Sequence, residues 1–188
     1  MKVLVACEFS GIVREAFRAR GHDAWSCDLL PSEIPGNHIQ DDVLKHLNDG
    51  WDLIIAHPPC TRLANSGVRW LYERHLWLDL AVATLFFNEF QILGNNPRVK
   101  VCIENPIPHI WAKLFIGEYT QIIQPWMFGH GETKATCLWL YNLPKLKPTN
   151  IVSGREGRIW KMSPSPERSK LRSKTFPGIA KAMAEQWG

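Results

Sequence analysis

Short apolar runs alternate along the chain with longer stretches in which apolar residues recur every three or four positions. The runs fit buried β-strands, and the spaced stretches fit amphipathic helices. Strands are expected at residues 2–7, 24–27, 52–56, 99–103 and 135–141. Helices are expected at residues 12–20, 44–47, 70–93 and 179–187. This alternation predicts an α/β, Rossmann-like fold, with a mostly parallel sheet that carries helices on both faces.

Segments rich in proline and glycine separate these elements. Gly21 is expected to cap the C-terminus of the helix at residues 12–20. Residues 31–40 are expected to form a loop. Residues 142–172 contain several prolines and look irregular. No repeat or linker divides the chain, so residues 1–188 are expected to form one domain, with 142–172 as an irregular basic insertion.

The most informative stretch is residues 51–67, where a predicted strand runs into His57-Pro58-Pro59 and then Cys60. Proline lacks the backbone donor that a sheet requires, so the strand must end there. Loops at the carboxyl ends of parallel strands are where α/β sheets bind ligands. A cysteine taken alone is more often a small buried hydrophobe. Two prolines before it and a polar loop after it favour a positioned nucleophile.

A second predicted strand ends in a comparable way, at Glu104-Asn105-Pro106. A glutamate at a strand end would usually be exposed to solvent if it stood alone. If this strand and the strand at 52–56 are neighbours, however, Glu104 and Cys60 face one crevice.

Acidic residues also follow earlier elements. Asp28 ends the second predicted strand, where an acid commonly accepts hydrogen bonds from ribose hydroxyls, although a turn or a helix cap would use it as well. Asp42 precedes the short helix at 44–47 and would either bind a ligand or cap that helix. Glu8-Phe9-Ser10-Gly11 forms a tight turn after the first strand, which by itself is weak support for a ligand site.

Composition excludes several classes of protein. The chain has 188 residues, 45% hydrophobic and 21% charged, enough for one sizeable core. It has no apolar run that could span a bilayer and no signal-peptide pattern, so a cytoplasmic protein without a membrane partner is expected. Its five cysteines form no CxxC pair, which argues against a disulfide framework and a metal site. Leu63 stands where zinc deaminases have the second cysteine of their motif, so that class is excluded.

The net charge of +4 is compatible with a nucleic-acid partner without requiring one. The charge is concentrated in residues 145–174, where lysine and arginine far outnumber the two glutamates. From charge alone, contact with phosphates and a solvated surface are about equally good explanations of this segment.

Together the motifs resemble those of the DNA cytosine-5 methyltransferases, and they occur in the order found in that family. The most specific match is Pro58-Pro59-Cys60, with Ser66-Gly67 downstream, which is similar to the family's catalytic loop. Glu104-Asn105-Pro106 resembles its Glu-Asn-Val element, Glu132-x-Lys134-x-Thr136 its Gln-x-Arg-x-Arg element, and Thr175-Phe176-Pro177 its last motif.

The resemblance implies a methyltransferase domain that binds S-adenosylmethionine (SAM) and acts on DNA. The turn Phe9-Ser10-Gly11 would lie under the methionine part of SAM, Asp28 would bind the ribose, and Asp42 would accept from the adenine amino group. Two further positions, Pro58 and Thr175, belong to motifs that line the same pocket.

The resemblance also implies a mechanism. A thiolate adds to C6 of cytosine, which makes C5 nucleophilic, and Cys60 would supply it. Glu104 would stabilise the charge at N3, a role that requires burial to raise its pKa. Lys134 would neutralise charge near the carbonyl. A base in duplex DNA must be flipped out to reach Cys60.

Departures from the family bear on the substrate. His57 replaces a small residue before the prolines, and Thr136 stands where a second arginine is usual. Residues 142–172 are too few for an ordinary target-recognition domain. The chain thus resembles a short, phage-like member with low sequence specificity, in which the basic segment would hold phosphates and a second copy or another protein would supply any specificity.

Three functions stay open from the sequence. The first is methylation of cytosine in DNA, and the second is the same chemistry on RNA or on a free cytosine nucleotide. The third is a non-catalytic SAM-fold binding module that requires a partner. The presence of both Cys60 and Glu104 favours catalysis, whereas the short insertion keeps the second function open.

Overall fold

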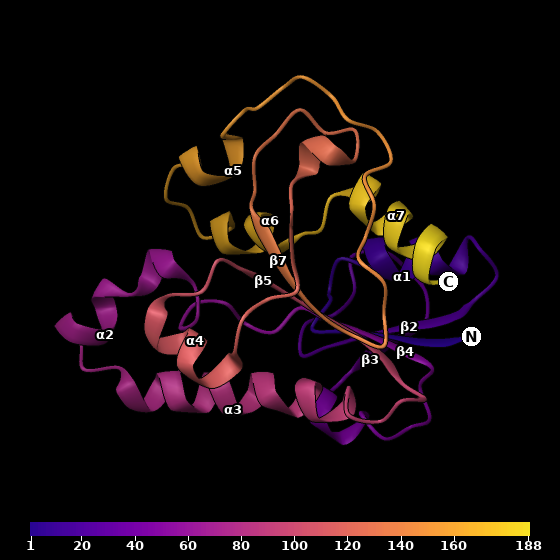
Figure 1. Ribbon diagram of the computed structural model, residues 1–188, viewed down its shortest axis with the longest axis horizontal. Helices are drawn as coiled ribbons and strands as arrows, with labels where there is room; N and C mark the ends of the chain where they lie inside the picture. The colour runs from indigo at the N-terminus through magenta and orange to yellow at the C-terminus, as the bar shows by residue number, and fades with distance from the viewer.

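A seven-stranded sheet in the order β3-β2-β1-β4-β5-β7-β6 forms the middle of the molecule (Figure 1). The computed structural model describes all residues from 1 to 188. The strands are β1 (Lys2–Ala6), β2 (Asp23–Asp28), β3 (His38–Gln40), β4 (Leu53–Ala56), β5 (Lys100–Pro106), β6 (Gln121–Ile123) and β7 (Thr136–Tyr141). Strands β1 to β5 pair in parallel, and β7 is antiparallel to β5 and β6. The expected α/β fold with a mostly parallel sheet is confirmed.

Helices cover both faces of this sheet, with α1 packed against α7 on one face and α3 against α4 on the other (Figure 1). The helices are α1 (Ile12–Arg18), α2 (Arg69–Glu73), α3 (Trp77–Leu93), α4 (Ile110–Ile116), α5 (Arg158–Lys161), α6 (Arg168–Ser173) and α7 (Pro177–Trp187). None of them combines the length and the apolarity needed to cross a membrane.

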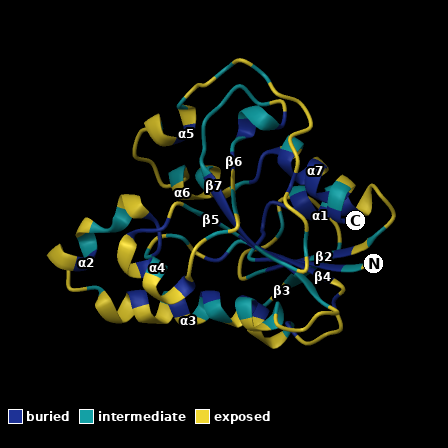
Figure 2. Cartoon of the chain, viewed as in Figure 1, coloured by how far each residue is buried: buried dark blue, intermediate teal, exposed yellow.

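The central strands are buried on both faces, which explains why their sequences are continuous apolar runs. Along β1, Val3 and Val5 join the core under α1 and α7, whereas Leu4 and Ala6 join the core under α3 and α4. Figure 2 shows these strands as buried segments inside a shell of more exposed helices. The parallel pairing of β1, β4 and β5 brings their carboxyl ends to one edge of the sheet.

The helix expected at residues 70–93 is in fact two helices. Helix α2 ends at Glu73, α3 begins at Trp77, and His75 between them has a φ of 52°. A residue in this left-handed conformation cannot continue a right-handed helix. The apolar spacing gave no sign of the break because Leu71 and Leu80, on either side of it, enter the same core.

Smaller expectations also differ from the structure. The loop expected at 31–40 ends in strand β3, and the helix expected at 44–47 is a 3-10 turn at Val43–Lys45. Helix α1 ends earlier than predicted, so Ala19 is its C-cap and Gly21 lies beyond it.

Two longer segments are more ordered than predicted. Strand β5 continues beyond residue 103 to Pro106 because its antiparallel pairing with β7 extends that far, so Glu104 lies within the strand. The segment 142–172 contains α5 and most of α6, two short helices that no long apolar pattern announces.

Candidate active site

A cleft of about 920 Å³ opens at the carboxyl ends of β1, β4 and β5. Strands β1 and β4 are the neighbours at which the strand order reverses, which is where open α/β sheets bind ligands. The predicted site residues that line this cleft are Phe9, Ser10, Pro58, Cys60, Glu104, Lys134 and Thr175. Gly11, Asp28 and Asp42 lie outside its lining.

The loop that carries Cys60 is held by the segment that follows β5. The Nδ2 of Asn105 donates a hydrogen bond of 2.9 Å to the carbonyl of Pro58, and both residues are buried. The backbone N–H of Asn65 donates to the carbonyl of Ile107 at 2.9 Å. Because contacts flank the cysteine on both sides, its Sγ is presented to the cleft from a fixed loop.

The surroundings of Cys60 shift the pKa of its thiol in opposite directions. Burial raises the pKa of the thiol, while Lys134 and Arg172 oppose that rise and Glu104 adds to it. A thiol in this setting is protonated at neutral pH, so it becomes a nucleophile only if a substrate or a base helps to remove the proton.

Glu104 is paired with His57, the residue that departs from the family pattern. The Nδ1 of His57 lies 3.4 Å from Oε2 of Glu104, with side-chain exposures of only 12% and 10%. Burial lowers the pKa of His57, but the charge and hydrogen bond of Glu104, together with the charge of Glu8, outweigh burial, and the pKa is raised. Burial likewise raises the pKa of Glu104, but His57, with smaller contributions from Lys134 and Thr175, lowers it overall. The expectation that the pKa of Glu104 is raised overall is therefore wrong, because cations in and near the same buried space outweigh the effect of burial.

Two buried polar atoms of residues that line this cleft, His57 Nε2 and Asn105 Oδ1, have no hydrogen-bond partner, and Glu104 Oε2 has only the 3.4 Å contact with His57. All three residues line the cleft. Buried polar atoms in folded proteins are nearly always paired, so a cluster of unpaired ones beside a thiol indicates a place for a polar ligand.

The turn after β1 is closed by Glu8, which the sequence analysis did not single out as a site residue. Its carboxylate accepts from the backbone N–H groups of Val13 at 2.7 Å and Arg14 at 3.2 Å, and from the hydroxyl of Ser10 at 3.1 Å. Gly11 has a φ of 74°, which favours glycine, and it precedes the first residue of α1. The first amides of α1 are thus already satisfied, that of Ile12 by the hydroxyl of Ser10 and the next two by Glu8, and they are not free for an anion.

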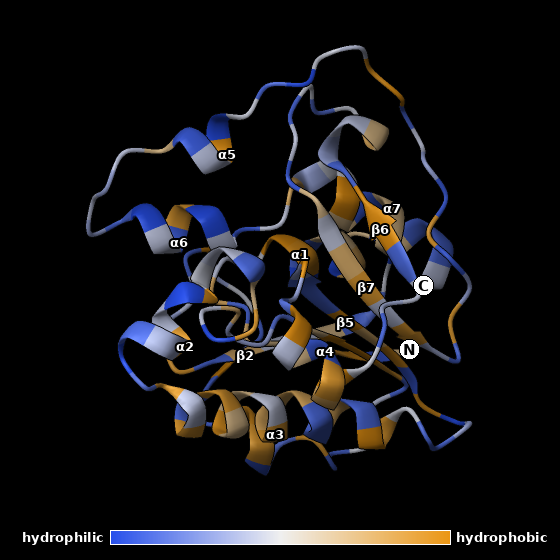
Figure 3. Cartoon of the chain, turned by 60° about the vertical axis from the view of Figure 1, so that its left-hand side comes forward, coloured by the Kyte–Doolittle hydropathy of each residue, from blue (hydrophilic) through white to orange (hydrophobic).

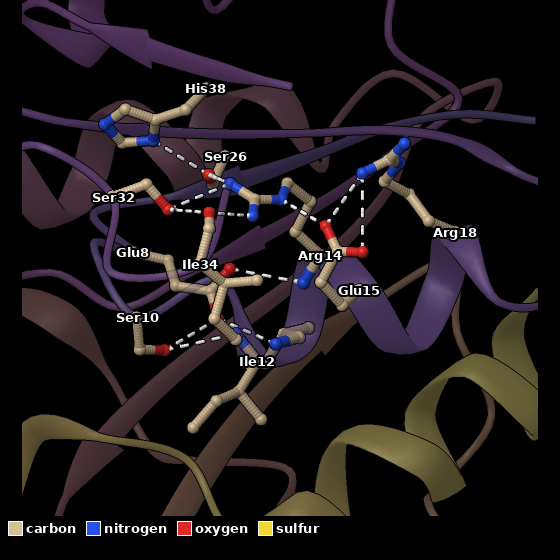
Figure 4. A network of polar contacts seen from close by, with 11 residues as sticks. Glu8, Ser10, Ile12, Arg14, Glu15, Arg18, Ser26, Ser32, Ile34 and His38 are labelled. Carbon is tan, nitrogen blue, oxygen red and sulfur yellow. Dashed lines mark hydrogen bonds and ion pairs between the residues drawn. The ribbon is translucent and has the colours of Figure 1, made fainter. Parts of the chain in front are cut away.

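Arg14 connects this turn to β2 and to the loop after it (Figure 4). Its guanidinium is fully buried and donates to the hydroxyls of Ser26 at 2.8 Å and Ser32 at 3.0 Å, and to the carbonyl of Ile34 at 2.6 Å. The Nε donates to Glu15. This network fixes the turn 8–11 against the segment that follows Asp28.

Replacement of Arg14 by alanine should lower the free energy of unfolding by roughly 2–5 kcal/mol, because it leaves a cavity and several buried acceptors without donors. Urea denaturation measures this. The matched control is Arg18→Ala, since Arg18 lies in the same helix but is exposed and pairs only with Glu15. Equal stability loss in the two variants would contradict the role given to the network.

Asp28 and Asp42 lie close together although they do not line the cleft. Burial first, and then the charges of Asp28, Cys27 and Asp42, raise the pKa of Cys7, a residue of the cleft lining. Only Oδ1 of each aspartate is hydrogen-bonded within the chain, to the N–H of Leu30 and of Leu44 respectively. The Oδ2 atom of each aspartate has no hydrogen-bond partner within the chain and is therefore available to donors on a ligand.

Lys134 and Thr175 complete the opposite side of the cleft. The Nζ of Lys134 donates to the carbonyl of Lys174 at 3.1 Å, and its backbone N–H donates to the side chain of Gln124 at 3.0 Å. This joins the segment before β7 to the start of α7, so the last motif of the chain lies beside Glu104.

Comparison with known proteins finds a distant structural similarity. No family model and no curated protein matches the chain. Among solved structures it is similar to an E. coli protein described as a candidate DNA modification methyltransferase encoded within a prophage. The similarity has 14% identity and a TM-score of 0.48, and it covers 80% of this chain and 51% of that chain, so this chain spans about half the length of that protein.

Several residues that contact the predicted site residues, or line the cleft with them, could not be located from the sequence. His57 was visible as a departure before the prolines, but its pairing with Glu104 depends on the neighbouring positions of β4 and β5. Arg14 was not predicted as a structural residue, because arginine in a helix is usually exposed. Trp160, Arg168 and Arg172 line the cleft from α5 and α6, and nothing in the sequence located them there.

Proposed function

We propose that this protein transfers a methyl group from SAM to C5 of cytosine in DNA, through a covalent adduct at Cys60. The observation that carries the proposal is the arrangement in one cleft of a thiol, a buried His57–Glu104 pair and unpaired polar atoms. Cytosine has a ring N3, a carbonyl and an amino group that could satisfy such atoms.

In this proposal Cys60 supplies the electron pair that makes C5 reactive. Its thiol gives up a proton, and the sulfur forms a bond to C6 while the electrons of the C5–C6 double bond move to C5. After C5 has gained the methyl group, the proton on C5 passes to water in the cleft and the electrons of that C–H bond re-form the C5–C6 double bond. The carbon–sulfur bond breaks with its electron pair returning to sulfur, which restores the ring and the thiolate. Lys134 and Arg172 favour the thiolate because both are positive and near the sulfur.

In this proposal the His57–Glu104 pair holds one proton that can form a hydrogen bond to N3 of the base. Negative charge develops on the ring when the thiolate adds, and a hydrogen bond from Glu104 would offset it if Glu104 receives the proton that His57 holds. Because the groups lie 3.4 Å apart and are nearly buried, the proton can shift between them without solvent. Lys134 would offset charge near the carbonyl, as a point charge without a bidentate fork.

The residues around the turn after β1 fit SAM, which would supply an electrophilic methyl carbon when bound. Asp28 and Asp42 each have one carboxylate oxygen without a partner in the chain, and the charges of both act on Cys7 of the cleft lining. These oxygens suit the hydroxyl donors of a ribose and the amino donor of an adenine. Phe9, Ser10 and Pro58 would line the same end of the cleft, and Thr175 would approach it from the start of α7.

Replacement of Asp42 by alanine should weaken binding of SAM by roughly 1–3 kcal/mol, because an amino donor would lose its acceptor in a partly buried site. Isothermal calorimetry with SAM measures the change. Asp49→Ala is the matched control, since its carboxylate is exposed and pairs with His46 only. No detectable heat at millimolar SAM with the folded wild-type protein would contradict the assigned cofactor.

The proposed function is tested by incubation with tritiated SAM and a mixture of DNA, RNA and cytosine nucleotides, followed by separation of the pools and of the labelled bases. Tritium in 5-methylcytosine of DNA supports the proposal, and Cys60→Ser is the blank. Label found only in RNA or only in free nucleotide would mean that this molecule, and not DNA, is the substrate. Label at an exocyclic nitrogen, or none in any pool although SAM binds, would contradict the chemistry.

A further inference from the structure

Trp160 is exposed over 62% of its surface, although its neighbour Ile159 is exposed over only 7%. Ile159 belongs to the core under α1 and α7, so it anchors the short helix α5 while the indole points away from that core. Trp160 nevertheless lines the same cleft as Cys60. A large aromatic ring left exposed on the wall of a cleft is more typical of a binding surface than of a structural residue.

The same wall carries cations that no acid neutralises. Lys134, Arg168 and Arg172 line the cleft and form no ion pair, and Nε of Arg168 is buried without a hydrogen-bond partner. Lys174, which also lines the cleft, is by contrast paired with Glu33 at 2.6 Å, and Arg158 is paired with Glu132 at 2.9 Å. Arg168 and Arg172 are therefore cations of the cleft lining that have no acid partner, which indicates an anionic ligand there.

The opposite wall contains a second aromatic residue with positive neighbours. Trp70 of α2 lines the cleft, and the guanidinium groups of Arg69 and Arg74 lie 4.1 Å and 4.3 Å from its ring centroid. Figure 3 shows α5 and α6, both largely hydrophilic, on the same side of the molecule as α2. The cleft that contains Cys60 thus has an exposed aromatic residue with cations on one wall, and on another wall Trp70, whose ring carries Arg69 and Arg74 outside the lining.

We propose that the wall formed by α5 and α6 binds an unpaired stretch of polynucleotide, with Trp160 stacked on a base and Arg168 and Arg172 on phosphates. The inference rests on the proposed function, since it names the form of substrate that reaches Cys60. Alternating aromatic and basic groups in a groove are the means by which proteins hold single strands. In a duplex the faces of the bases are covered by their neighbours, and α5 and α6, with four and six residues, are short for reading a major groove.

Fluorescence anisotropy with labelled 12-nucleotide probes tests this without any methyl donor. The probes are one cytosine-containing DNA strand, its duplex, and the RNA strand of the same sequence. The DNA strand should bind more tightly than the duplex, and Trp160→Ala should weaken that binding about 5- to 150-fold, the range measured for loss of one stacked base. Trp160→Phe should retain most of it. The matched control is Trp77→Ala, since Trp77 is also exposed, at 41%, but does not line the cleft.

The contribution of the cations to strand binding is measured separately from stacking, by varying the salt concentration. With Arg168 and Arg172 on phosphates, the slope of log K against log salt should be about −1.4, and Arg172→Ala should reduce its magnitude by about 0.7. Arg98→Ala, on the exposed surface away from the cleft, should leave the slope unchanged. Thermal melting verifies that each variant is folded.

Equal or tighter binding of the duplex, or unchanged binding by Trp160→Ala, would overturn the inference. RNA that binds as well as DNA supports it, because stacking and phosphate contact are common to both. Strand binding without methyl transfer would leave the inference standing and refute the proposed function alone. If Trp160→Ala kept both methyl transfer and strand binding at the wild-type level, the inference would be refuted and the proposed function would stand.

Discussion

Replacement of Cys60 by serine should reduce methyl transfer by roughly 10⁴-fold or more while affinity for SAM stays near that of the wild type. A serine hydroxyl in the same place is a far weaker nucleophile than a thiolate, so addition to C6 fails. The sulfur is not among the groups that would hold SAM. Turnover is measured with tritiated SAM and binding by calorimetry. Glu104→Gln should also lose most turnover, and the double variant should be little worse than the worse single variant, because both groups serve one transition state.

The covalent bond itself can be trapped with DNA that contains 5-fluorocytosine. Once methyl transfer has occurred, C5 of that base has no proton to lose, so the carbon–sulfur bond cannot be cleaved. Mass spectrometry should then find DNA on the peptide that contains Cys60. Cys7→Ala is the matched control, because Cys7 lines the same cleft, and the adduct should still form in that variant. An adduct at any other cysteine, or full activity in Cys60→Ser, would refute the assignment.

The position of the cleft could be predicted from the sequence because parallel strands place their carboxyl ends along one edge. Two apolar runs ending in proline motifs were enough to predict that Cys60 and Glu104 share a crevice, and the parallel pairing of β4 with β5 provides the geometry for it. Such an inference needs only the period of the apolar residues and the chemistry of proline, both of which are local properties.

What could not be predicted depends on contacts between distant residues. The pKa of Glu104 follows from His57, 47 positions away, and Arg14 is buried only because Ser26, Ser32 and Ile34 come to it from the next strand and loop. Composition identified the segment 145–174 as basic, but not which of its cations would be paired. That distinction requires the positions of Glu33 and Glu132, which neutralise some of them and leave Arg168 and Arg172 free.

The pH dependence of turnover should reveal the His57–Glu104 pair. The groups that face His57 are Glu104 on β5, Glu8 in the turn after β1, and Lys134 before β7. Burial and Lys134 lower its pKa, and the two carboxylates together raise it above the ordinary value. His57 therefore keeps its proton to a higher pH than a free histidine and loses it as the pH rises through that raised pKa. The pKa of the Cys60 thiol is also raised, so thiolate is gained mainly at higher pH.

In the wild-type protein, turnover should rise with pH up to the pKa of the pair and level off above it, because further gain in Cys60 thiolate is offset by loss of the His57 proton. In His57→Gln, Glu104 alone can hold that proton, and a carboxyl titrates below an imidazolium whose pKa is raised. The break should move to lower pH, and kcat should fall by about 10²–10⁴-fold, the usual contribution of a positioned acid. His46→Gln, which removes an imidazole paired with Asp41 and Asp49 outside the cleft, should keep both the rate and the break. If His57→Gln also kept both, the proton at N3 would have to come from another group, and the buried pair would serve only to position Glu104.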